Sequence, residues 1–146
     1  MPFEYSLLVI QLLATCFMCG LIWVIQLVHY PSFLMLDKKM FVRFEDFHSR
    51  RITWIVGPAM LIEIFVAALI VRISVYHFAA WLNLLSVVAL WFSTWLLSIP
   101  CHKKLMDGFD EKTIARLVVT NWPRTFLWSL RTIILAYALI FYQEGA

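Results

Sequence analysis

Hydrophobic and polar residues follow one another along this chain in long blocks. Four apolar runs cover residues 6–30, 53–71, 79–99 and 123–142, and shorter segments between them carry most of the charges. About twenty apolar residues in a helix are enough to cross the hydrocarbon core of a bilayer. The pattern therefore predicts an all-α integral membrane protein, with residues 1–146 forming a single transmembrane domain. We expect a four-helix antiparallel bundle.

Two of the connecting segments have a periodicity of their own. Each follows a proline, Pro31 or Pro100, which cannot continue a helix without loss. Apolar residues then recur at helical spacing with charged residues between them. These apolar residues are Phe41, Phe44 and Phe47 in the first segment and Ile114, Leu117 and Val118 in the second. We predict an amphipathic interfacial helix in each of the two loops, the second one capped by Asp110. The repeated order of span, proline and amphipathic helix is compatible with an internal duplication.

Charge distribution predicts the orientation of the bundle. Only 14% of the residues are charged, and 63% are hydrophobic. The cations lie almost entirely in the segments 30–52 and 100–124, whereas the opposite side offers only Arg72 and the terminal amine. Lys and Arg close to span ends stay on the cytoplasmic side. We therefore expect both long loops in the cytoplasm, both termini outside, and the protein in the cell (inner) membrane. The basic pI then reflects topology, and no soluble basic module is present that would indicate nucleic-acid binding.

Three of the four histidines fall at the predicted cytoplasmic end. His29 precedes Pro31, His48 precedes two arginines, and His102 lies between Pro100 and two lysines. Imidazoles bind metals and move protons near neutral pH. We predict that the three histidines border one cytoplasm-facing cavity. The alternative is that each is solvated separately among the lipid headgroups.

Glu63 and Arg131 are charged residues inside predicted membrane spans, where burying a charge in hydrocarbon costs free energy. Counted inward from Trp54 and Trp122, each lies about 13 Å deep at helical rise. A lone charge at that depth costs at least a few kcal/mol, so such residues face the bundle interior and find partners. We predict a Glu63–Arg131 contact, either as a purely structural ion pair or as the floor of the polar cavity.

Other polar residues are predicted to complete this cavity. Gln26 lies three residues before His29, and Asn121 and Arg124 share one face of the fourth span with Arg131. Trp128 lies deeper on the same span. The predicted catalytic residues are His29, His48, Glu63, Arg124 and Arg131, and the predicted cofactor-binding residues are Gln26, His102, Asn121 and Trp128.

The cofactor is left open by the sequence. Two or three of the imidazoles of His29, His48 and His102, together with Glu45 or Glu63, are candidate ligands for Fe, Cu or Zn. No two of the histidines have a spacing such as H-x-x-x-H, so the ligands would have to meet through tertiary folding. Haem would need one or two axial histidines, and no histidine lies in the middle of a span.

Three short stretches carry a resemblance to a known family. They are His29-Tyr30-Pro31, Ile99-Pro100-x-x-Lys103-x-Leu105 and Trp122-x-Arg124-x-x-x-Trp128-x-x-Arg131-Thr132. Together with the four-span layout, they resemble the small membrane proteins of the anthrone-oxygenase-like group. The resemblance implies an oxygenase that acts on flat phenolic rings without a conventional cofactor. In such a protein His29 or His48 would be the base, and Arg124 and Arg131 would stabilise the anion.

Two other classes of function fit the same sequence. The protein is alternatively a non-enzymatic accessory subunit of a larger membrane complex, or a redox carrier that binds haem or quinone. Besides the lipid bilayer, the predicted partners are a lipophilic aromatic substrate and further membrane subunits, including copies of the chain itself.

Overall fold

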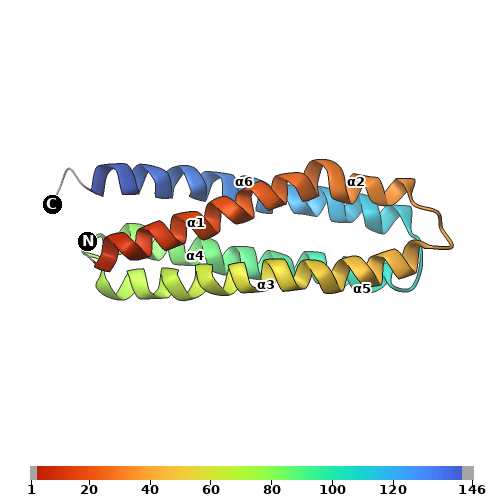
Figure 1. Cartoon of the computed structure of the whole chain (residues 1–146), viewed down its shortest axis with the longest axis horizontal. Helices are drawn as coiled ribbons and strands as arrows, with labels where there is room; N and C mark the ends of the chain where they lie inside the picture. The colour runs from red at the N-terminus through yellow and green to blue at the C-terminus, as the bar shows by residue number, and fades with distance from the viewer. Residues whose placement is uncertain (1–2, 143–146) are drawn as a thin grey trace.

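The computed structural model describes residues 3–142, and it shows four long helical runs lying side by side (Figure 1). The first run consists of α1 (Phe3–Val24), the π-helical segment η1 (Ile25–His29), α2 (Tyr30–Ser32) and the 3-10 segment η2 (Phe33–Met35). The second is α3 (Phe41–Ile73). The third consists of α4 (His77–Ser93), the π-helical segment η3 (Thr94–Ser98) and α5 (Ile99–Leu105), and the fourth is α6 (Glu111–Tyr142).

The predicted all-α four-helix bundle is confirmed. Helix α1 packs against both α3 and α6, α3 also packs against α4, and α4 and α6 contact each other more sparingly. The start of α1 and the end of α6 lie at one end of the bundle (Figure 1). We call it the terminal end. The opposite end holds the connecting segments 36–40 and 106–110, and we call it the basic end.

The predicted amphipathic helices of the two long loops are present, and both are the first turns of longer helices. Residues 41–52 and 111–122 are helical, but they continue without a break into α3 and α6. Their apolar faces pack inside the bundle, because Phe41, Ile114 and Leu117 are fully buried. The third helix is likewise extended by α5 beyond the predicted span. Tertiary burial of these faces therefore lengthens the helices and deepens the bundle at its basic end.

Asp110 caps α6 as predicted. Its carboxylate accepts hydrogen bonds from the backbone N–H of Lys112 (3.2 Å) and the hydroxyl of Thr113 (2.5 Å). It also forms an ion pair of 2.7 Å with Lys104 at the end of α5. The cap therefore fixes the connection between the third and fourth runs.

Two π-helical segments interrupt the otherwise regular helices. Segment η1 ends two residues before Pro31, and η3 ends two residues before Pro100. Proline lacks an N–H and its ring crowds the carbonyl four residues earlier, and a wider π turn relieves both problems. The same device therefore occurs once in each half of the chain.

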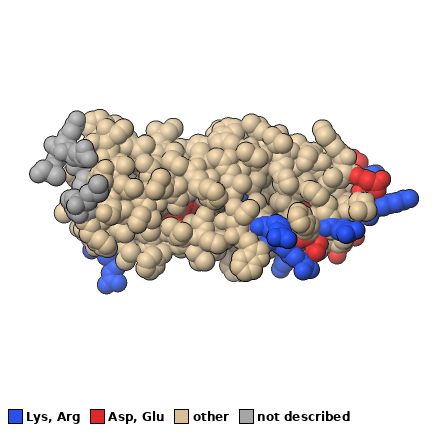
Figure 2. All heavy atoms as spheres, viewed as in Figure 1, with Lys and Arg blue, Asp and Glu red and all other residues tan. Residues whose placement is uncertain are grey.

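Charges are strongly segregated on the surface (Figure 2). Lys and Arg gather mainly at the basic end, while the middle of the visible face is almost entirely uncharged apart from a small recessed Asp/Glu patch. All four helical runs are long and apolar enough to cross a membrane. The predicted integral membrane protein is supported on these grounds, while the direction of insertion and the choice of membrane stay predictions.

Candidate functional site

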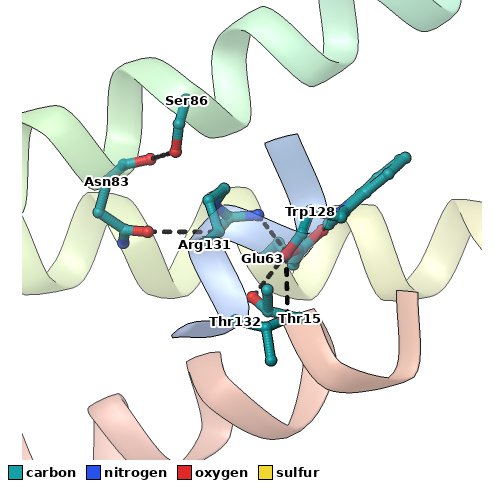
Figure 3. A network of polar contacts seen from close by, with 7 residues as sticks. All are labelled: Thr15, Glu63, Asn83, Ser86, Trp128, Arg131 and Thr132. Atoms are coloured by element: carbon teal, nitrogen blue, oxygen red, sulfur yellow. Dashed lines mark hydrogen bonds and ion pairs between the residues drawn. The ribbon is translucent and has the colours of Figure 1, made fainter. Parts of the chain in front are cut away.

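The predicted contact between Glu63 and Arg131 is present in the middle of the bundle (Figure 3). The Arg131 Nη1 lies 2.5 Å from the Glu63 Oε1, and both side chains are almost completely buried. The same carboxylate accepts hydrogen bonds from the Thr15 hydroxyl (2.8 Å) and from the Trp128 indole N–H (3.0 Å). Arg131 also donates from Nη2 to the Asn83 Oδ1 at 3.2 Å. This network joins α1, α3, α4 and α6.

A second buried polar layer lies closer to the basic end. The Asn121 amide donates to the Gln26 Oε1 at 2.8 Å, and Gln26 donates to the backbone carbonyl of Val118 at 3.2 Å. Arg124 donates from Nη2 to the Asn121 Oδ1 and from Nη1 to the Thr94 hydroxyl at 3.2 Å. Gln26 is in η1 and Thr94 is in η3. Both π segments therefore supply a polar side chain to this layer.

The structure brings the three predicted histidines together. The His29 Nε2 and the His48 Nδ1 form a hydrogen bond of 2.7 Å. The ring centroids of His48 and His102 are 5.4 Å apart. The histidines are thus neighbours in one cluster and are not dispersed among the headgroups.

His102 is held on both sides of its ring. Its Nδ1 lies 2.6 Å from the Glu45 Oε1, and its Nε2 lies 3.2 Å from the Tyr30 hydroxyl. Glu45 is fully buried and accepts a further hydrogen bond of 2.8 Å from Ser49. A carboxylate at Nδ1 fixes the tautomer in which Nδ1 carries the proton and Nε2 is free to accept one. The geometry therefore leaves Nε2 as the basic atom of His102.

The predicted three-histidine metal site does not form in this arrangement. Within residues 3–142, no group of three or more His, Cys, Asp and Glu side chains is placed to hold a metal ion. The physical reason is the direction of the ring nitrogens. The His29 Nε2 and the His48 Nδ1 are directed at one another, while both ring nitrogens of His102 are directed at Glu45 and Tyr30.

A cavity of about 450 Å³ opens beside this cluster, and we call it the basic-end cavity. All four helical runs contribute to its wall, which includes Gly57 of α3 and many apolar side chains. Its polar and aromatic wall residues include Tyr30, Trp91, Ser98, His102, Arg124 and Trp128. The cavity thus combines an imidazole, a guanidinium and two indoles with apolar side chains, several hydroxyl groups and Lys103.

The predicted lining of this cavity is corrected in several positions. Of the predicted site residues in the described chain, only His102, Arg124 and Trp128 line it. The others do not: His29, His48, Gln26, Asn121, Glu63 and Arg131 lie outside the lining. His29 and His48 form a hydrogen bond with each other, and so do Gln26 and Asn121, so these polar groups are not directed into the cavity. The ion pair is not its floor, since Trp128 lines the cavity and donates to Glu63 from that side.

Three hydrogen-bonding groups of this wall lack a protein partner. The Trp91 Nε1, the Ser98 hydroxyl and the Arg124 Nε are buried, and none has a partner among the residues described. Arg124 also forms no ion pair within that part of the chain. A buried cation without a counter-ion is costly. The wall therefore favours a ligand that carries negative charge on an acceptor oxygen.

Several of these residues could not be singled out from the sequence. Glu45 is expected from the sequence as a metal ligand beside the histidines, but nothing in the spacing of Tyr30 or Glu45 indicates that both would contact His102. Thr94 and Ser98 are small polar residues inside an apolar run. A proline alone does not locate them, because π segments precede Pro31 and Pro100 whereas Pro58 and Pro123 lie inside regular α-helix.

Comparison with protein-family models, with curated proteins and with solved structures finds no match to this chain. The functional conclusion therefore has to come from the geometry of the cavity.

Proposed function

We propose that this protein is a membrane-embedded oxygenase-like enzyme that acts on a small lipophilic aromatic substrate in the basic-end cavity. The observation that carries the proposal is the pairing of a base and a cation on one wall. His102, oriented by Glu45, and Arg124, which has no counter-ion in the described chain, line the same cavity. Proton abstraction from an acidic aromatic compound needs both groups.

The first step is removal of a proton from the substrate through the Tyr30 hydroxyl, which lines the cavity and passes its own proton to the His102 Nε2 at 3.2 Å. The negative charge that develops on the substrate oxygen is stabilised by the N–H groups of Arg124 Nε and Trp91 Nε1. These donors are fixed before the reaction begins, so that they need no reorganisation when charge appears. Glu45 stabilises the imidazolium that forms, as a positioning residue.

The second step is reaction of the substrate anion with dioxygen. For an anthrone-type ring, the anion transfers an electron to dioxygen and a C–O bond forms at the former methylene carbon. The peroxide anion so formed takes back the proton held by His102, and the resulting hydroperoxide loses water to give a ketone. The methylene thus loses two hydrogens and gains one oxygen atom, and the second oxygen atom leaves as water.

The experiment is oxidation of anthrone by the purified full-length protein in detergent under air. Oxygen uptake and quinone absorbance are followed against the uncatalysed rate. We expect His102→Asn to lower the enzymatic rate by roughly 10² to 10⁴-fold, as for loss of a general base. Arg124→Met should lower the rate by roughly 10²-fold, as for loss of one anion-stabilising donor.

His77→Asn is the matched control. His77 begins α4 and is exposed, far along the chain from the cavity wall, so its replacement should leave the rate unchanged. A wild-type rate no greater than that of a folded His102→Asn variant would contradict the proposal.

The absorption spectrum and metal content of the same sample distinguish the alternatives. A Soret band would favour a haem carrier, and a stoichiometric metal would favour a metalloenzyme. If the sample shows no Soret band and no catalysis, an accessory subunit is favoured.

A further inference from the structure

A second and larger cavity lies in the other half of the bundle. It has a volume of about 650 Å³ and lies between α4 and α6, where these two helices contact one another sparingly. We call it the terminal-end cavity, and its lining includes Ile70, Asn83, Ser86, Leu130, Arg131 and Tyr137. It shares none of its lining residues with the basic-end cavity among the residues described.

Two hydrogen-bond donors in this lining lack a partner. The Arg131 Nε and the Asn83 Nδ2 are buried, and neither finds an acceptor within residues 3–142. The other polar groups of these residues are engaged, because Arg131 donates to Glu63 and to the Asn83 oxygen (Figure 3). The Ser86 hydroxyl donates a hydrogen bond of 2.6 Å to the backbone carbonyl of Asn83. Arg131 is only 3% exposed, so bulk solvent does not satisfy its Nε.

The charge balance at this cavity differs from that of the basic-end cavity. Arg131 is already neutralised by Glu63 at 2.5 Å, whereas Arg124 has no counter-ion in the described chain. A carboxylate ligand would therefore add a further negative charge to a site that holds no excess positive charge. The wall suits an uncharged acceptor.

We propose that the terminal-end cavity is a second binding site, for a neutral lipophilic molecule whose carbonyl oxygen accepts hydrogen bonds from the Arg131 Nε and the Asn83 Nδ2. The volume lies within the range of roughly 300–1,000 Å³ that is typical of small-molecule sites. The lining is otherwise dominated by aliphatic and aromatic side chains, which match a hydrocarbon ring or chain. A ketone or ester carbonyl on such a skeleton satisfies both donors without adding charge.

The test uses photo-crosslinking of the full-length protein in detergent with 4-decylbenzophenone, a neutral diaryl ketone. Labelled peptides are identified by mass spectrometry. Three competitors with similar chains are compared: undecanophenone, undecylbenzene and 4-decylbenzoate. We expect labelling on the lining residues of α4 and α6, and we expect undecanophenone to compete roughly tenfold better than undecylbenzene, as for one added hydrogen bond to a charged group. The benzoate should compete more weakly than the ketone.

Two substitutions locate the binding groups. Asn83→Leu removes the Nδ2 donor and should reduce the ketone's advantage over the hydrocarbon. Ser86→Ala is the matched control in the same wall, because the Ser86 hydroxyl is already used by the backbone, and it should leave that advantage unchanged. If Asn83→Leu does not fold, Ala138→Phe fills the cavity from α6 without touching either donor and should abolish specific labelling.

The carbonyl can belong to a bilayer lipid or to a free small molecule. Competition by a diacyl phosphatidylcholine, but not by its dialkyl ether analogue, would identify the lipid ester as the natural source. Competition by undecanophenone alone would identify a free ketone. Equal competition by ketone and hydrocarbon, strongest competition by the benzoate, or labelling spread evenly over all four helices would overturn the proposal.

Discussion

Two buried arginines on α6 define the chemistry of this protein at the scale of residues. Arg124 and Arg131 lie seven residues apart, and each lines a different cavity with an unpartnered Nε in the described chain. Arg131 is paired with Glu63, whereas Arg124 donates to the neutral side chains Thr94 and Asn121 and forms no ion pair within residues 3–142. The same residue type therefore makes one wall net positive and the other neutral.

The Glu63–Arg131 pair permits a prediction on stability. Glu63→Gln or Arg131→Met alone leaves one buried charge without its partner, and each should lower the free energy of unfolding by about 3 to 5 kcal/mol. The double variant removes both charges and should lose less than either single variant. Thermal or denaturant unfolding in detergent measures all three. Arg50→Gln is the control, because the Arg50–Asp46 pair is exposed and should contribute nothing measurable. Additive losses in the double variant would contradict the prediction.

At the scale of elements, the two π segments determine which side chains meet. Segment η1 presents Gln26, and η3 presents Thr94 and Ser98. Beyond η3, α5 carries His102 to Glu45 of α3. A π turn contains one residue more than an α-helical turn, so it shifts the residues that follow by one position relative to an uninterrupted α-helix. The position of His102 therefore depends on η3.

Deletion of Leu96 tests this dependence. The residue lies in η3 and its side chain is 61% exposed, so that few packing contacts are lost with it. Because the π turn holds one residue more than an α-helical turn, the deletion should convert η3 to regular α-helix and keep α5 close to its present rotation. We expect near-unchanged helix content by circular dichroism, a lower melting temperature because the Thr94–Arg124 contact is disturbed, and retention of the His102-dependent activity. Leu96→Ala keeps the chain length and should leave all three unchanged.

The Asp110 cap gives a prediction on pH dependence. Hydrogen bonds from Lys104, then from Thr113, lower the pKa of the Asp110 carboxyl to about 2. Because the pKa in the folded state lies below the unfolded value of about 3.9, the carboxylate stabilises the fold above pH 4 and loses this effect as the pH falls toward 2. Asp110→Asn should therefore melt at a lower temperature than wild type at pH 7, and the difference should shrink between pH 4 and pH 2. A difference that stays constant over this range would contradict the assignment.

At the scale of the whole molecule, the segregated cations predict the direction of insertion. Met35 lies at the basic end and Val75 lies between α3 and α4, and both are strongly exposed. In a background where Cys16, Cys19 and Cys101 are replaced by alanine, we introduce Met35→Cys or Val75→Cys. A membrane-impermeant maleimide added to intact cells should label the cysteine at 75 and should label the one at 35 only after the membrane is opened. The reverse pattern would overturn the predicted topology.

The sequence by itself determined the four membrane-crossing helices, the segregation of charge and the need for Glu63 and Arg131 to meet. Each follows from a large free-energy cost that any fold must avoid: exposing apolar runs to water, or leaving a charge alone in hydrocarbon. The tertiary structure decided the rest. Whether His29 or His102 faces a cavity depends on π turns and helix rotation, and contacts such as His102–Glu45 join residues far apart in the chain. These choices depend on differences of a few kcal/mol in packing, which a linear pattern does not record.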